Sequence, residues 1–81
     1  MDEYHVVLVG RAGDHPGTNI YLVGPGSRKN AIHTGETIFR KETKLATNVA
    51  IRCSVAHSGT EESGVQYIDR LVTLMEERRE E

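Results

Sequence analysis

The sequence predicts an α+β domain with four or five short antiparallel strands followed by one C-terminal amphipathic helix. Short β-branched runs separated by glycine and proline occupy residues 4–55, whereas residues 61–77 carry apolar residues at helical spacing. Connections of hairpin length favour antiparallel pairing, so the helix must cover one face or one end of the sheet. We therefore expect either an open sheet crossed by the helix or a small, partly closed barrel capped by it.

The first two strands are expected at residues 4–9 and 19–23. Both runs are apolar on both faces, which is typical of central strands. The sequence Gly24-Pro25-Gly26 ends the second run, because proline presets φ for a turn and glycine accepts a positive φ. Two further short strands are expected at residues 31–33 and 36–41.

The clearest strand signal is a period of two over residues 49–55. This alternation turns Arg52 outwards and predicts a buried face formed by Val49, Ile51, Cys53 and Val55. Cys53 is then expected to be a small buried apolar residue. A catalytic role would need His57 on the same face, which requires the strand to continue regularly.

The final element is predicted to be a helix with an apolar stripe at i, i+3, i+6, i+7 and i+10. Ser63 and Gln66 fit a capping box at its start. Acidic residues four apart repel one another near its end, so we expect fraying after about Glu77 and a frayed acidic tail at residues 78–81. The stripe, which we expect to form an interface, comprises Val65, Ile68, Leu71, Val72 and Met75.

The length of 81 residues predicts a single domain, residues 1–81, with a small core. A single cysteine excludes a disulfide within the chain, so oligomerisation is the expected source of extra stability. No apolar run is long enough for a transmembrane helix, and the acidic residues 1–4 do not resemble a signal peptide. These features predict a cytoplasmic protein without a membrane partner.

Charge is distributed unevenly along the chain. Residues 25–52 hold six Lys and Arg against two Glu, whereas residues 61–81 hold seven acids against three Arg. Such asymmetry bears on partners and association, and it predicts that the basic middle contacts an acidic helix of another copy or of another protein.

The basic middle also supports an alternative, a nucleic-acid-binding module that contacts backbone phosphates. The small residues of the 26–30 loop would expose backbone N–H groups beside two long cations, although a solubilising loop has the same composition. The net charge of −2 and the scarcity of aromatic residues disfavour this function. Its candidate phosphate or anion contacts are Arg28, Lys29, Arg40, Lys44 and Arg52.

No catalytic constellation is apparent in the sequence. Residues 10–18 lack the lysine of a nucleotide-binding loop, and no serine lies in a nucleophile elbow. The four histidines lack metal-site spacing, so we expect no metal and no cofactor. The weakest hypothesis is a small enzyme or ligand-binding protein with a site formed by Asp14, His15, His33 and His57.

The leading hypothesis is a non-enzymatic interaction, assembly or regulatory protein that acts as a homo-oligomer. The basic middle and the C-terminal helix would be its contact surfaces. Small size alone suggests the analogy with regulators and assembly parts of microbes, viruses and phages.

Overall fold

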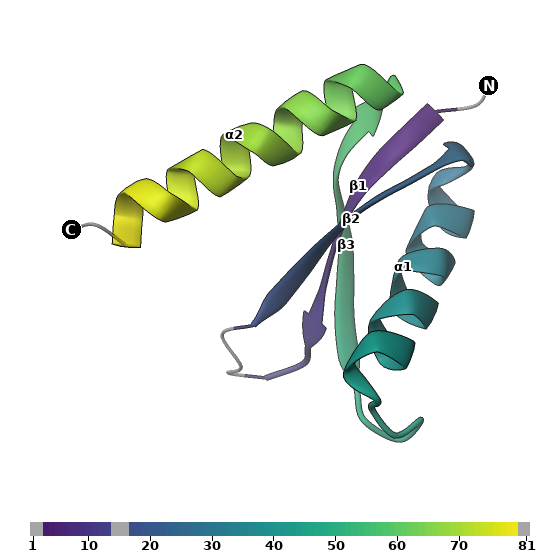
Figure 1. The fold of residues 1–81 in the computed structure, drawn as a ribbon. Coiled ribbons are helices and arrows are strands. Elements are labelled where there is room, and N and C mark those ends of the chain that lie inside the picture. The colour runs from purple at the N-terminus through teal and green to yellow at the C-terminus, as the bar shows by residue number, and fades with distance from the viewer. Residues whose placement is uncertain (1–2, 14–16, 80–81) are drawn as a thin grey trace.

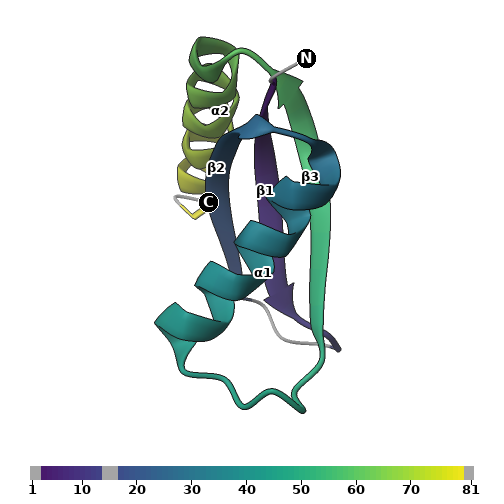
Figure 2. The ribbon, with the colours of Figure 1, turned by 90° about the vertical axis from the view of Figure 1, so that its right-hand side faces the viewer.

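The computed structural model describes residues 3–13 and 17–79 of the chain. It contains an antiparallel sheet of three strands, β1 (Glu3–Arg11), β2 (Thr18–Gly26) and β3 (Ile51–Gly59), in the order β2-β1-β3. Helix α1 (Arg28–Thr43) and helix α2 (Glu61–Arg79) lie on opposite sides of this sheet (Figures 1 and 2). The predicted α+β class is confirmed, and the sheet is open rather than a closed barrel.

Strand β1 lies at the centre of the sheet, as its two apolar faces predicted. Val6, Val7 and Val9 have no solvent exposure. Val7 and Val9 belong to the main core with Ala31 and Phe39 of α1, whereas Val6 belongs to the opposite face. The main core therefore lies between the sheet and α1.

The prediction of strands at residues 31–33 and 36–41 was wrong, because this whole region belongs to α1. Ser27 caps the helix by accepting a hydrogen bond from the Asn30 backbone N–H at 3.1 Å. Ala31, Gly35 and Phe39, four residues apart, form the buried face. Two of these three residues are small, so their helical spacing is a weaker hydrophobic signal than the β-favouring Thr37-Ile38-Phe39 run. The sheet therefore has three strands instead of four or five.

Strand β3 begins and ends later than predicted. Val49 precedes it, whereas Ile51, Cys53 and Val55 pack against the main core as expected. A bulge at Ala56 shifts the register, since Val7 pairs with Val55 while the neighbouring Val6 pairs with His57. This extra residue changes the side-chain alternation. His57 consequently lies on the α2 side of the sheet, away from Cys53, whose thiol is 3.8 Å from the Ile32 carbonyl oxygen on the α1 side.

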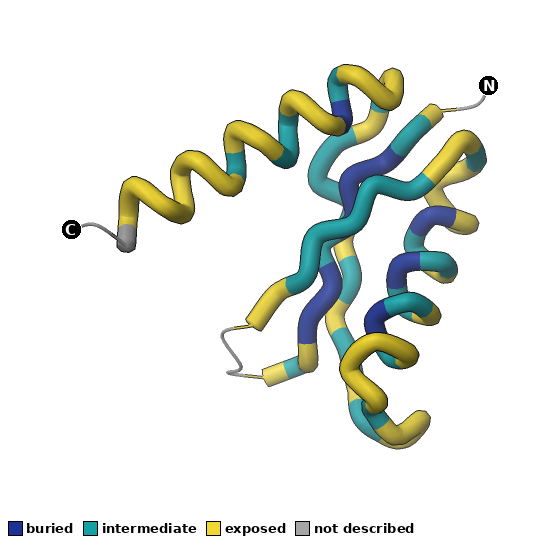
Figure 3. The backbone as a smooth tube through the Cα atoms, in the orientation of Figure 1, coloured by how far each residue is buried: buried dark blue, intermediate teal, exposed yellow. Residues whose placement is uncertain are grey.

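The C-terminal helix is confirmed and is the longest element of the described structure. It extends through Arg79, past the predicted fraying point at Glu77, whereas residues 80–81 lie outside the described residues. Its first turns lie over the sheet, and its later turns diverge from it and are mostly exposed (Figures 1 and 3). Neither described helix has an apolar stretch sufficient to span a bilayer.

Candidate interaction surface

The start of α2 is held by Thr60. The Thr60 Oγ1 accepts from the Ser63 backbone N–H at 3.1 Å, and the Thr60 carbonyl accepts from the Gly64 N–H at 3.0 Å. This is the pattern of an N-cap residue, so the cap lies three residues before the predicted Ser63. The Ser63 hydroxyl instead donates to the Thr60 carbonyl at 2.9 Å.

The first half of α2 packs directly on the sheet. Gly64 is buried, and a Cβ atom at this position would lie only 2.5 Å from Cδ1 of Leu22 on β2. The His57 ring of β3 stacks on Tyr67 with a centroid distance of 5.1 Å, and its Nε2 lies 3.0 Å from the Ser63 Oγ. These contacts attach the helix near its N-terminal end.

One side of α2 faces the sheet in the first half of the helix. In the second half the same side is apolar. Leu71 and Met75 follow Gly64 by 7 and 11 residues, so they continue the same side of the helix. Val72, Leu74 and Met75 nevertheless remain 40 %, 51 % and 51 % exposed. We call Leu71, Val72, Leu74 and Met75 the α2 overhang. A hollow of about 250 Å³ is lined by Leu71, Leu74, Met75 and Arg78.

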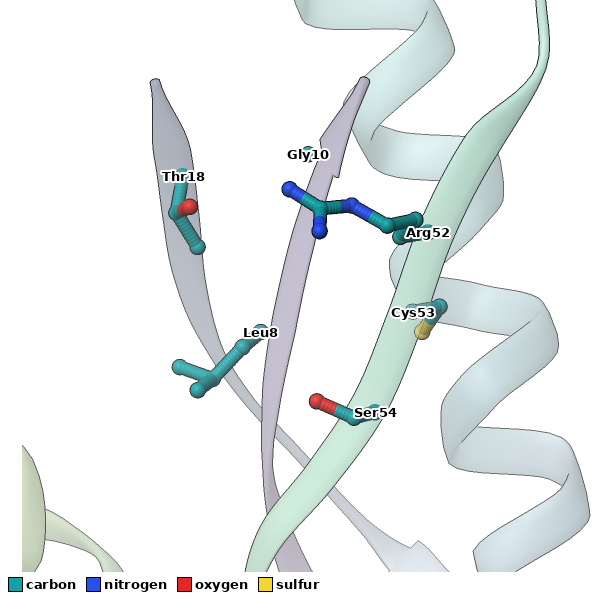
Figure 4. A pocket seen from close by; sticks show the side chains of 6 residues that line it. All are labelled: Leu8, Gly10, Thr18, Arg52, Cys53 and Ser54. Carbon is teal, nitrogen blue, oxygen red and sulfur yellow. The ribbon is translucent and has the colours of Figure 1, made fainter. Parts of the chain in front are cut away.

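The sheet also has an uncovered region on its α2 side. Figure 4 shows a cleft there, of about 290 Å³, lined by Leu8, Gly10, Thr18, Arg52, Cys53 and Ser54. Thr18, Gly10 and Arg52 form one row across the three strands. Because Gly10 has no side chain, Arg52 extends across β1 towards Thr18 (Figure 4). Ile20 pairs with Leu8 and shares its face. We call Leu8, Gly10, Thr18, Ile20, Arg52 and Ser54 the open sheet face.

The predicted interface residues divide into two groups. Ile68 and Leu71 are half-buried, whereas Val65, Val72 and Met75 are exposed. Leu74 was absent from the predicted stripe but lies beside it, three residues after Leu71. Its presence widens the apolar side of the helix to about half the circumference, because the predicted positions i, i+3, i+6, i+7 and i+10 did not include i+9.

The predicted basic residues do not form one site. Arg28, Lys29, Arg40 and Lys44 belong to α1 or its C-cap, whereas Arg52 lies on the opposite side of the sheet. Arg40 also donates to the Ala46 carbonyl at 3.0 Å. The outer side of α1 instead presents a different set at helical spacing. We call it the basic face of α1, and it comprises Lys29, His33, Arg40, Lys41 and Lys44.

The histidines are also distributed among separate sites. His5 is buried, with Nδ1 2.7 Å from Ser58 Oγ and Nε2 2.9 Å from the Gly26 carbonyl oxygen. His33 is exposed on α1, and His57 lies on the other side of the sheet. Asp14 and His15 lie outside the described residues. Among residues 3–13 and 17–79, no three His, Cys, Asp or Glu side chains form a group suited to a metal ion.

Cys53 lies in a partly apolar setting between β3 and α1. Burial raises the pKa of its thiol, and the negative charge of Glu36 raises it further. The environment therefore favours the protonated thiol, which is a poor nucleophile.

Comparisons with protein-family models, curated proteins and solved structures found no match to this chain.

Proposed function

We propose that the protein is a non-enzymatic interaction or assembly protein that acts as a homo-oligomer, with the α2 overhang in its interface. The supporting observation is the 40–51 % exposure of Val72, Leu74 and Met75 on the sheet-facing side of the helix. Single exposed apolar residues are ordinary on protein surfaces, but a contiguous group on one helix is typical of an interaction site.

The magnitude of the uncovered apolar surface supports self-association. Burying one large apolar side chain contributes about 1.5–3 kcal/mol. Val65, Val72, Leu74 and Met75 are each roughly half exposed. Covering all four would therefore contribute roughly 3–6 kcal/mol per chain. Association itself costs about 4 kcal/mol or more in lost translational and rotational freedom. Burial of the apolar residues of both copies in one interface offsets this cost better than burial of the residues of one copy alone.

The serine–histidine pair that the described residues form on the α2 side, His57 with Ser63, does not favour hydrolytic chemistry. The Ser63 hydroxyl donates to the Thr60 carbonyl, so the His57 Nε2 at 3.0 Å is the donor to Ser63 Oγ. In this arrangement the serine proton is directed to the Thr60 carbonyl and not to the imidazole, as it would be for a nucleophile and its general base. The pair fixes the start of α2 instead.

The test compares neutral polar substitutions on the two sides of α2. Leu74→Gln with Met75→Gln removes apolar surface from the overhang, whereas Thr73→Gln changes an exposed residue on the opposite side. We expect the double variant to weaken the subunit dissociation constant by about tenfold or more, equivalent to about 1.4 kcal/mol or more. The Thr73→Gln control should dissociate like the wild type in sedimentation velocity experiments. Equal dissociation constants for all three proteins would refute the proposal.

A second function, binding of a polyanion such as nucleic acid, is supported by the basic face of α1. Helix α1 has 16 residues and is about 24 Å long, so its cations can contact several phosphates along one nucleic-acid strand. Glu42 does not neutralise this face directly, because its carboxylate accepts a hydrogen bond from Tyr21 of β2 at 2.7 Å.

Fluorescence anisotropy with a labelled oligonucleotide tests this second function. The double variant Lys29→Ala, Lys41→Ala should bind the oligonucleotide more weakly. The dependence of its binding constant on salt concentration should fall by the amount expected for the loss of about two phosphate contacts. Arg52→Ala, on the other side of the sheet, is the matched control and should bind like the wild type. Equal loss in the control, or no binding by the wild type, would contradict a role for the basic face of α1.

A further inference from the structure

We propose that two copies form a two-fold dimer in which α2 of each copy lies on the open sheet face of the other. This inference rests on the proposed function and specifies its partner and geometry. Each chain carries a helix half without a sheet beneath it and a sheet region without a helix above it. One molecule therefore supplies both complementary surfaces, so two copies can cover both of them across a two-fold axis.

The shape of the open sheet face suits a helix. Leu8 and Ile20 are paired across β1 and β2 and are only half-buried, so they offer an apolar centre. Gly10, Thr18 and Ser54 surround this centre with small residues, which leaves a shallow surface rather than a ridge. The apolar side of the α2 overhang would replace water over Leu8 and Ile20 in the partner.

Charge also favours α2 of a second copy as the occupant. Arg52 is exposed and extends across the open sheet face (Figure 4). Glu76 is exposed on α2 directly after Met75, at the edge of the apolar side of the helix. When the overhang covers Leu8 and Ile20, Glu76 would flank the contact on the face across which Arg52 extends. Their pairing would orient the helix, while the apolar contact would supply most of the affinity.

The reciprocal arrangement also doubles the contact between the two copies. The second half of α2, residues 71–79, is about 14 Å long, and the dimer would contain two such helix-on-sheet contacts related by the symmetry axis. Specific interfaces bury about 800 Å² per partner. Each chain contributes both its overhang and its open sheet face, so the interface draws on two surfaces of every copy. A two-fold contact of this kind closes on itself and leaves neither surface free for further chain growth.

Cysteine trapping between two differently tagged chains tests the geometry, with Cys53→Ser as the common background. One chain carries Ser54→Cys on the open sheet face, and the other carries Met75→Cys on the overhang. After mixing, subunit exchange and mild oxidation, we expect a disulfide between the two different chains. A third chain with Thr73→Cys, on the outer side of α2, is the control. We expect roughly tenfold less disulfide between it and the Ser54→Cys chain, because its Cβ points away from the sheet.

The molar mass of each protein, measured before oxidation, separates the two proposals. Monomers of 9.0 kDa would overturn the proposed function itself. Dimers that form no 54–75 disulfide, or that form chiefly 75–75 disulfides between two helices, would overturn helix exchange and leave self-association standing. Equal trapping at positions 73 and 75 would also overturn it.

Discussion

The imidazole of His5 connects all three strands of the sheet. It extends from β1, where it is 3 % exposed, to Ser58 of β3 and to the Gly26 carbonyl of β2. Because a carbonyl only accepts, Nε2 carries the proton that is donated to Gly26. The sequence showed a histidine in an apolar run but gave no indication of these partners, because they lie 21 and 53 residues away.

His5→Ala should destabilise the fold by about 2–3 kcal/mol. The substitution removes two hydrogen bonds and leaves the Gly26 carbonyl without its partner in a partly buried setting. Urea denaturation at neutral pH measures the change in the free energy of unfolding. His33→Ala, on the exposed side of α1, is the control and should change stability by less than about 0.5 kcal/mol. Equal effects of the two substitutions would contradict the structural role of His5.

The thiol of Cys53 provides a pH prediction at the same scale. Burial, aided by Glu36, raises its pKa above the ordinary value of 9.0. In the unfolded chain the thiol loses its proton near that ordinary value, whereas the folded protein retains it to higher pH. The contribution of Cys53 to stability is therefore fully present below pH 9 and decreases as the pH rises further.

Thermal melts between pH 7 and pH 10 test this contribution by comparing the wild type with Cys53→Ala. The difference in stability between the two proteins should shrink above pH 9. A difference that grows with pH would mean that the thiolate, not the thiol, is the favoured form in the folded state.

At the scale of elements, the docking of α1 depends on Gly35. A Cβ atom there would lie 2.9 Å from Cγ1 of Val7, which is fully buried. Alanine would favour the isolated helix by about 1 kcal/mol, but the overpacked contact costs about 1–3 kcal/mol and has no flexible side chain to absorb it.

We therefore expect Gly35→Ala to destabilise the protein by about 1 kcal/mol in urea denaturation, despite its favourable helix propensity. Thr37→Ala, on the exposed side of the same helix, should be neutral or slightly stabilising. A stabilised Gly35→Ala protein would show that α1 can move away from the sheet at little cost.

Elements with a strong apolar pattern were predictable from the sequence, and elements with a weak one were not. Strand β1 and helix α2 carry long apolar patterns and were found. Helix α1 was missed because alanine and glycine occupy two of its three buried positions, so the face that packs on the sheet has little hydrophobic signal. The bulge at Ala56 is set by pairing with β1, which no local pattern reveals.

The candidate interaction surface was predictable only in part, because residue spacing locates an apolar stripe but does not show whether the fold covers it. The stripe on α2 followed from residue spacing, but which of its residues lack cover depends on the angle at which the helix leaves the sheet. That angle is set by the tertiary contact of Gly64 with Leu22 and by the stacking of His57 on Tyr67. The open sheet face combines residues from three strands. Its residues could therefore be identified only once the register of strand pairing was known.

Considered as a whole molecule, the protein separates its charges across the sheet. The basic face of α1 lies on one side, and the acidic α2 lies on the other (Figure 2). The expected contact between the basic middle and an acidic helix is therefore not required for the proposed dimer. The affinity of the proposed dimer comes mainly from apolar residues of α2. Of the basic residues in the middle of the chain, only Arg52 contributes to its interface.

Light scattering at about 50 mM and then 500 mM salt tests this account most directly, because salt at the higher concentration screens exposed charge pairs. We expect a molar mass of twice 9.0 kDa, that of the proposed dimer, at both salt concentrations. A dimer that dissociates at 500 mM salt would assign the interface to charge pairing rather than to the α2 overhang. A mass of 9.0 kDa at both concentrations would contradict self-association altogether.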